Sequence, residues 1–124
     1  MNKEKIKITV TTEYLPQRSD PSKPLFFFVY KIKITNNRNE IIQLKNRYWH
    51  ITDAKNNFEE IRGPGVVGDQ PILNPGSSYK YKSYCPLTTE FGVMYGHFGM
   101  TTNNGKKFNA KINPFRLSVP HSVN

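Results

Sequence analysis

The stretch LFFFVYKIKIT, residues 25–35, decides the fold class because its apolar side chains recur at every second position. One face of an extended chain is entirely apolar here and carries Phe26, Phe28, Tyr30, Ile32 and Ile34. The other face is apolar at one end, with Phe27 and Val29, and basic at the other, with Lys31 and Lys33. Successive side chains of a β-strand point to opposite faces, so the pattern predicts a strand with one buried face.

The same alternation recurs along nearly the whole chain. It predicts further strands at residues 3–14, 41–45, 47–53, 57–62, 78–84, 93–102 and 107–112. Turn-forming residues separate these segments, and the Asn104-Gly105 pair predicts a type I′ hairpin. Many short strands divided by turns within 124 residues indicate one domain, residues 1–124, with an all-β fold, an antiparallel β-sandwich.

Composition limits the classes of partner. The chain has 18 Lys and Arg against 9 Asp and Glu, a net charge of +9 that attracts anions. Cys85 is the only cysteine, so no disulfide can form within the chain. The beginning, MNKEKIKITV, lacks the continuous apolar run of a signal peptide, and the run LFFFVY is too short to cross a bilayer. We therefore expect a soluble, cytoplasmic protein without a membrane partner.

The segment RGPGVVGDQP, residues 62–71, places Gly63, Gly65 and Gly68 in the spacing G-x-G-x-x-G of dinucleotide-binding turns. Such a turn must lead into a helix whose N-terminal amides hold the pyrophosphate, and Pro71 and Pro75 would disrupt that helix. The Rossmann interpretation is therefore rejected. Two interpretations remain: the glycines only shape the loop, or its amides form an anion-binding nest beside Arg62.

Several multi-residue blocks together resemble the ApaG family, and the resemblance spans almost the whole chain. They are TEYLP at 12–16, SDP at 19–21, RYWHITDA at 47–54, RGPGVVGDQPILNPG at 62–76, CPL at 85–87 and PFRLSVP at 114–120. The resemblance implies an immunoglobulin- or fibronectin-III-like β-sandwich that acts in protein recognition, with no established catalytic activity. It also implies pyrophosphate or nucleotide binding at Gly63, Gly65 and Gly68, although Pro64 departs from the family by lacking an amide donor.

Lysines form a second candidate site. If strands 3–14 and 25–36 pair, Lys5 and Lys7 lie near Lys31 and Lys33 on one outer face. Like charges directly opposite one another destabilise a sheet, so this basic patch is a candidate for binding a polyanion or an acidic protein. The alternative is an ordinary solvated face. Phe27 and Val29, at the other end, either contact a second copy of the chain or lie beneath the loop 15–24.

Enzyme chemistry finds little support in the sequence. His50, His97 and His121 are isolated, without metal-ligand spacing, and the first two are predicted to be solvated on outward faces. Cys85 is predicted to be buried, and no histidine base adjoins it. We expect no catalytic residue, metal or cofactor. We also expect no nucleic acid partner, because most Phe and Tyr lie in inward rows.

The sequence thus predicts a non-enzymatic binding module that recognises an unidentified protein through loops and an exposed sheet face, as a monomer or homodimer. The alternative is nucleotide polyphosphate binding at the Gly63–Gly68 loop with Arg62.

Overall fold

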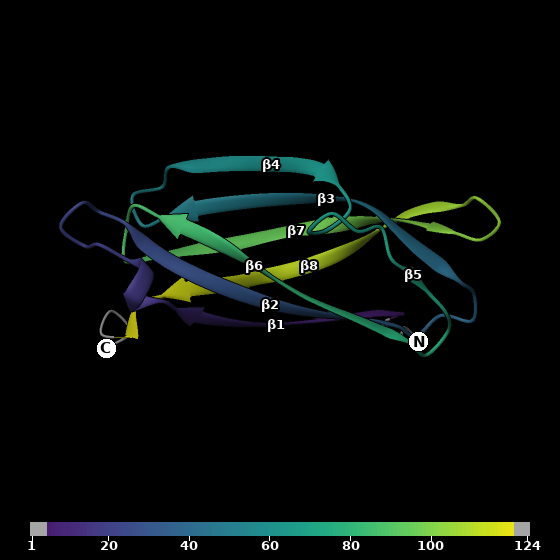
Figure 1. Cartoon of the computed structure of the whole chain (residues 1–124). Coiled ribbons are helices and arrows are strands. Elements are labelled where there is room, and N and C mark those ends of the chain that lie inside the picture. Colours follow the sequence, from purple (N-terminus) through teal and green to yellow (C-terminus); the bar gives the residue numbers. More distant parts are fainter. Residues whose placement is uncertain (1–4, 121–124) are drawn as a thin grey trace.

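The computed structural model describes residues 5–120, which form eight strands and one short 3-10 helix (Figure 1). The strands are β1 (Ile6–Tyr14), β2 (Phe26–Asn36), β3 (Ile42–Asp53), β4 (Phe58–Pro64), β5 (Ile72–Leu73), β6 (Ser78–Leu87), β7 (Phe91–Thr102) and β8 (Lys107–Ser118). The helix η1 (Pro16–Arg18) follows β1. His121 and the first residues of the expected strand 3–14 lie outside the described residues.

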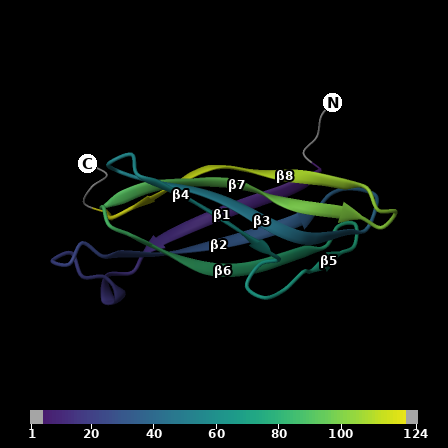
Figure 2. The same ribbon diagram turned by 90° about the horizontal axis from the view of Figure 1, so that it is seen from above.

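The strands form two antiparallel sheets that pack face to face, so the predicted all-β sandwich is confirmed. One sheet has the order β1-β2-β6, and the other has the order β4-β3-β7-β8, with β5 paired to β3. Figure 2 shows the second sheet from above, its strands crossing over those of the first. Each sheet therefore keeps one face in the core and one face toward solvent.

The core lies between the sheets and is built from the apolar rows that the alternation predicted. Phe28, Ile32 and Ile34 of β2 are almost completely buried, and Trp49, Met94 and Phe98 cover them from the other sheet. Tyr30 meets the Trp49 ring edge-on across the interface, with 5.5 Å between ring centroids. Aromatic pairs in this geometry add to the stability gained from burying their area.

Strand β3 joins two segments that the sequence analysis separated, 41–45 and 47–53. Its pairing with β7 shifts register between Leu44 and Asn46, so the irregularity is a bulge within one strand. The extra residue lets Leu44 and Trp49 both point inward, although simple alternation would place them on opposite faces.

The turn at Asn104-Gly105 differs from the predicted type I′ turn. Gly105 has a φ of +89°, whereas Asn104 is not among the described non-glycine residues with positive φ. The amide of Gly105 donates to the carbonyl of Thr102, and the amide of Thr102 donates to the carbonyl of Lys106. This is a longer hairpin loop that needs a left-handed conformation only at the glycine.

Two strands extend further than predicted because each accommodates a proline. Pro86 lies in β6 and Pro114 in β8, and both strands are at sheet edges. An edge strand tolerates proline where the missing N–H would have faced solvent. The alternation alone predicts that both strands end before these prolines, at residues 84 and 112.

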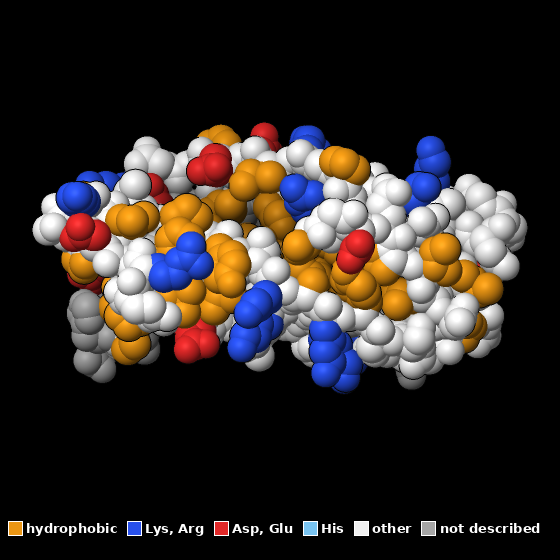
Figure 3. Space-filling view, in the orientation of Figure 1, with side chains coloured by type: hydrophobic (Ala, Val, Ile, Leu, Met, Phe, Trp, Pro, Cys, Tyr) orange, Lys and Arg blue, Asp and Glu red, His pale blue; other side chains and the backbone are white. Residues whose placement is uncertain are grey.

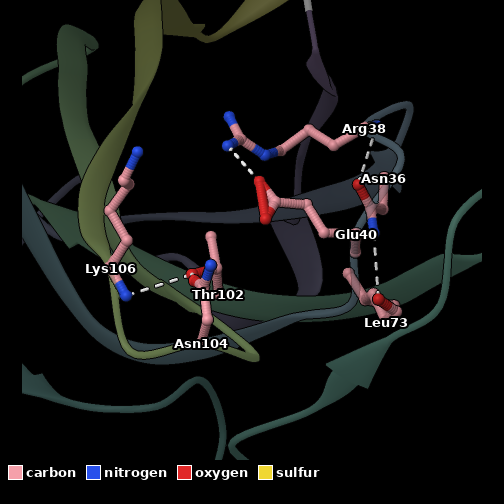
Figure 4. A network of polar contacts seen from close by, with 7 residues as sticks. All are labelled: Asn36, Arg38, Glu40, Leu73, Thr102, Asn104 and Lys106. Atoms are coloured by element: carbon pink, nitrogen blue, oxygen red, sulfur yellow. Dashed lines mark hydrogen bonds and ion pairs between the residues drawn. The ribbon is translucent and has the colours of Figure 1, made fainter.

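A polar network closes the end of the sandwich where β2 leaves the sheet (Figure 4). Asn36 is completely buried, and its side-chain nitrogen donates to the carbonyls of Glu40 and Leu73, both at 2.9 Å. Its side-chain oxygen accepts from the amide of Arg38, whose guanidinium forms an ion pair with Glu40 at 2.7 Å. One side chain therefore holds β2, the following turn and β5 together.

Candidate functional site

The glycine turn connects β4 to β5 and contains three residues with positive φ. These are Gly65 (+60°), Val67 (+47°) and Gly68 (+84°), while Gly63 still belongs to β4. A Cβ atom on Gly65 would lie 2.2 Å from the carbonyl oxygen of Asp69, so this position excludes any other residue. The turn thus requires glycine at residue 65 for steric reasons alone.

Most amides of this turn are already used by the backbone. The N–H of Gly65 donates to the carbonyl of Lys45 at 2.8 Å, and Val66 and Asp69 donate to each other's carbonyls. Pro64 has no N–H to offer. Within residues 64–69, the amides of Val67 and Gly68 are the ones left for an anion.

The turn presents carbonyl oxygens to a cation. The Nη1 of Arg47 donates to the carbonyls of Pro64 and Gly65, both at 3.0 Å. A Cβ atom on Gly63 would lie 3.0 Å from that guanidinium, so glycine at residue 63 leaves room for Arg47. The glycine spacing therefore has a structural explanation that involves an arginine which the sequence reasoning did not consider.

Arg62 is directed away from this arrangement. Its guanidinium lies over the ring of Tyr48 on β3, 4.4 Å from the ring centroid. The structure therefore places Gly65 and Gly68 in one turn, with Gly63 at the end of the preceding strand, but it does not bring Arg62 to the turn.

Side-chain hydrogen bonds attach the turn firmly to the sandwich. Val66 is fully buried in the core, whereas Val67 is exposed. The hydroxyl of Tyr79 donates to the carboxylate of Asp69 at 2.7 Å, and the side-chain amide of Gln70 donates to the Lys45 carbonyl. The geometry of the turn is consequently fixed by contacts with both β3 and β6.

Lysines converge on the outer face of the three-stranded sheet, but Lys5 and Lys7 are not the direct cross-strand neighbours of Lys31 and Lys33. Strands β1 and β2 pair as expected, but Thr9 lies opposite Lys33 and Thr11 opposite Lys31. Lys7 lies opposite Thr35, one row beyond Lys33, and Lys5 precedes β1.

The direct neighbours of Lys31 and Lys33 come instead from β6. Lys31 lies opposite Lys82, and Lys33 lies opposite Lys80. We call these four residues the lysine quartet; all are exposed. Figure 3 shows basic side chains along the margin of the molecule that this sheet forms.

At the other end of the same face, the loop 15–24 contacts Phe27. The Arg18 guanidinium lies over the Phe27 ring, 4.5 Å from its centroid, and the Ser19 hydroxyl accepts from the Phe27 amide. Of the two alternatives for Phe27, the structure shows the contact with this loop.

The outer face of the other sheet carries a row of stacked rings, which we call the aromatic ladder. His50 of β3 lies between Phe58 of β4 and Tyr95 of β7, with centroid distances of 4.9 and 4.7 Å and interplanar angles of 13° and 16°. In the next row Tyr48 stacks with His97 at 5.2 Å. His50 and His97 do face outward as predicted, but rings of neighbouring strands cover them.

Charged groups border the ladder. The Tyr48 hydroxyl donates to the Glu60 carboxylate at 2.7 Å, and this bond raises the pKa of Tyr48 because it favours the protonated phenol. Arg62 covers the other face of that ring. Phe58 is 63% exposed and Tyr95 is 39% exposed, although both are large and apolar.

The remaining candidates for chemistry show no reactive arrangement. Cys85 is buried as predicted, and burial, reinforced by the charge of Glu59, raises the pKa of its thiol to about 12. Within residues 5–120, no group of three or more His, Cys, Asp or Glu side chains could hold a metal ion. Over the same range, no helix is long and apolar enough to cross a membrane.

Comparison with known proteins decides the family. The profile of the ApaG domain, also designated DUF525, matches residues 16–102. The chain belongs to the ApaG domain family. Protein ApaG of Mesorhizobium japonicum is 50% identical over 115 residues, which cover 93% of this chain and 88% of that protein. Protein ApaG of Agrobacterium fabrum is 49% identical over 115 residues, with the same shares covered.

A solved ApaG-like structure confirms the fold at the level of the backbone. The structure of an ApaA protein from Bordetella pertussis superposes with a TM-score of 0.90 at 41% identity. The match covers 93% of this chain and 94% of that chain. The two-sheet sandwich is therefore the architecture that this chain shares with that protein.

Proposed function

We propose that this ApaG-family chain is a non-enzymatic, cytoplasmic binding module that recognises another protein through the outer face of the β4-β3-β7-β8 sheet. The observation that carries this proposal is the aromatic ladder, in which Phe58 and Tyr95 remain exposed at the two ends of a stack. Aromatic residues and arginine dominate the binding energy of protein interfaces. Here Arg62 borders the ladder, so the face combines these residue types on rigid strands.

Stacking gives the ladder a further property of a recognition surface. The His50 ring is held on both sides, so ordering it against a partner costs little additional conformational entropy. The hydrogen bond from Tyr48 to Glu60 restrains a second ring in the same way. A partner with an apolar centre and charged margins matches this face.

The orientation of the rings favours a protein over a nucleic acid. Nucleobases bind proteins by stacking on free aromatic faces. Both faces of His50 are occupied within the ladder, and Tyr48 lies between Arg62 and His97. The inner rings of the ladder are therefore closed to stacking by a nucleobase, and the exposed Phe58 and Tyr95 at its ends offer apolar area to the surface of a protein.

Nucleotide polyphosphate binding at the glycine turn is the alternative function. Its support is the pair of consecutive left-handed residues Val67 and Gly68, whose amides make no backbone hydrogen bond within the turn. Titration of pyrophosphate into labelled protein tests it. Amide shifts centred on Val67 and Gly68 that persist in salt would support this alternative, and their absence would contradict it.

Site-specific photo-crosslinking tests the protein-recognition proposal. A photoreactive phenylalanine analogue replaces Tyr95 in one variant and the exposed Asn37, which precedes β3 and lies outside this sheet, in a matched control. In an extract of the source cells, we expect a discrete adduct from position 95 that is absent from position 37. That adduct should disappear when Phe58→Asp is added. An adduct of twice the chain mass would identify a second copy as the partner. Identical adducts at both positions, or none, would contradict the proposal.

A further inference from the structure

The lysine quartet places four positive charges at close quarters on one sheet face. Lys31 and Lys82 are directly opposite across β2 and β6, as are Lys33 and Lys80. Side chains directly opposite have Cβ atoms about 5 Å apart, and the two rows are about 7 Å apart along the strands. The four ammonium groups therefore lie within reach of one small anion.

Among the residues that the structure describes, none of these lysines forms an ion pair with a carboxylate. Within residues 5–120 the ion pair is that between Arg38 and Glu40, which does not involve the quartet. Like charges directly opposite one another destabilise an antiparallel pair. An anion bound between the rows would remove this repulsion, so binding and stability are coupled at this face.

The surroundings of the quartet set the size of the anion. The quartet and the threonines Thr9 and Thr11 line an open hollow of ≈ 480 Å³, within the usual range for small-ligand sites. The row beyond Lys33 and Lys80 holds Lys7, together with Thr35 and Ser78, whose hydroxyls are hydrogen-bonded to each other. The row beyond Lys31 and Lys82 holds Glu13, Val29 and Tyr84, which carry no positive charge.

We propose that the lysine quartet, with Thr9 and Thr11, binds a compact polyphosphate anion on the outer face of the β1-β2-β6 sheet. Lysine is well suited to phosphate because its ammonium is a compact charge with three donors. The threonine hydroxyls add neutral donors beside it. This site is separate from both the aromatic ladder and the glycine turn, so it stands independently of the proposed function.

Charge density distinguishes this ligand from polymeric anions. An extended acidic peptide places same-face carboxylates about 7 Å apart, so only about two of them would meet the quartet. A nucleic acid strand carries one phosphate per about 3.4 Å of helix axis and would continue past Glu13 at one end, where a carboxylate repels phosphate. A polyphosphate concentrates several charges within the length of the quartet itself.

Calorimetric titration of inorganic tripolyphosphate at physiological salt tests the proposal. The variant carries Lys33→Gln and Lys80→Gln, and the matched control carries Lys106→Gln and Lys107→Gln, which removes the same charge at a hairpin. We expect the quartet variant to bind about tenfold more weakly and the control to change by less than about twofold. The quartet variant should also unfold at an equal or higher temperature, because repulsion is relieved.

Four results would overturn the proposal. Wild-type protein that does not bind tripolyphosphate would do so directly, and equal weakening in both variants would show that only net charge matters. If a single-stranded oligonucleotide or a polyglutamate peptide binds more tightly than tripolyphosphate, and this binding requires the quartet, the ligand is a polymer and not a compact anion. The changes in NMR amide shifts on addition of tripolyphosphate locate the site. Binding at the quartet predicts changes at residues 31–33 and 80–82. Changes confined to Val67 and Gly68 would instead place the binding site at the glycine turn.

Discussion

Replacing Asn36 by alanine should destabilise the sandwich more than any comparable change at its surface. Its side chain makes three hydrogen bonds, all to backbone groups, and it is completely buried. Alanine leaves the carbonyl of Leu73 without this donor in a buried position. The carbonyl of Glu40 and the amide of Arg38 are partly buried, so water can replace those two bonds in part.

The expected loss follows from these three groups. A buried group left unsatisfied costs about 1–3 kcal/mol, and a bond that water can replace costs less. The free energy of unfolding should therefore fall by about 2–4 kcal/mol, a large share of the 5–15 kcal/mol typical of a domain. With a urea dependence of about 2 kcal/mol per molar, the midpoint should shift by about 1–2 M.

Urea unfolding followed by tryptophan fluorescence measures this loss, because Trp49 is the only tryptophan and is buried. The exposed neighbour Asn37 provides the control, since Asn37→Ala should change stability by less than about 0.5 kcal/mol. A loss below about 1 kcal/mol in Asn36→Ala, or one equal to the control, would refute the reasoning.

A second substitution at the same position adds a pH test. In Asn36→Asp, an ionised carboxylate would face the carbonyl oxygens of Glu40 and Leu73, which raises its pKa in the folded protein. Folding then favours the protonated carboxyl. The stability of Asn36→Asp relative to the wild type is therefore highest below about pH 3.9, the pKa of aspartate in the unfolded chain, and is lost as the pH rises through the folded pKa. A deficit that shrinks as the pH rises would contradict this account.

Three further outcomes are expected from single groups. Gly65→Ala should lower the free energy of unfolding in urea by more than about 2 kcal/mol, because the new Cβ atom would meet the Asp69 carbonyl. Gly105→Ala should lower it by about 1–2 kcal/mol, because residue 105 also has a positive φ, +89°, but has open space for a Cβ atom. The Cys85 thiol, with its pKa raised to about 12, should react with a thiol reagent at mildly alkaline pH only after unfolding; rapid native reaction would contradict its burial. Tyr81→Phe should leave stability within about 0.5 kcal/mol or raise it, because the hydroxyl has no hydrogen-bond partner among residues 5–120; a clear loss would show that this hydroxyl is bonded.

The sequence predicts the fold well because both sheets keep one solvated face. Along β2, the alternation from Phe26 to Ile34 reports directly which side chains enter the core. Prediction fails where that period is interrupted, as at the bulge between Leu44 and Asn46. It also fails at Asn36, because asparagine is a residue type common in turns, whereas here it is buried as the last residue of its strand.

The candidate surfaces were less predictable because they depend on register between strands. Lys80 and Lys82 are visible in the sequence as an alternating pair, yet nothing local indicates that they face Lys33 and Lys31. The aromatic ladder likewise combines residues from β3, β4 and β7. Such groupings follow from long-range pairing, which a single sequence does not display.

The contact between Arg47 and the glycine turn has a consequence for how this family can change its sequence. Any side chain at residue 63 must displace the guanidinium that holds the carbonyls of Pro64 and Gly65. Loss of that glycine should therefore be tolerated only together with a shorter residue at position 47, so the two positions should co-vary among homologues. At residue 63, evolution would then keep a glycine for the sake of a neighbouring arginine rather than for a ligand.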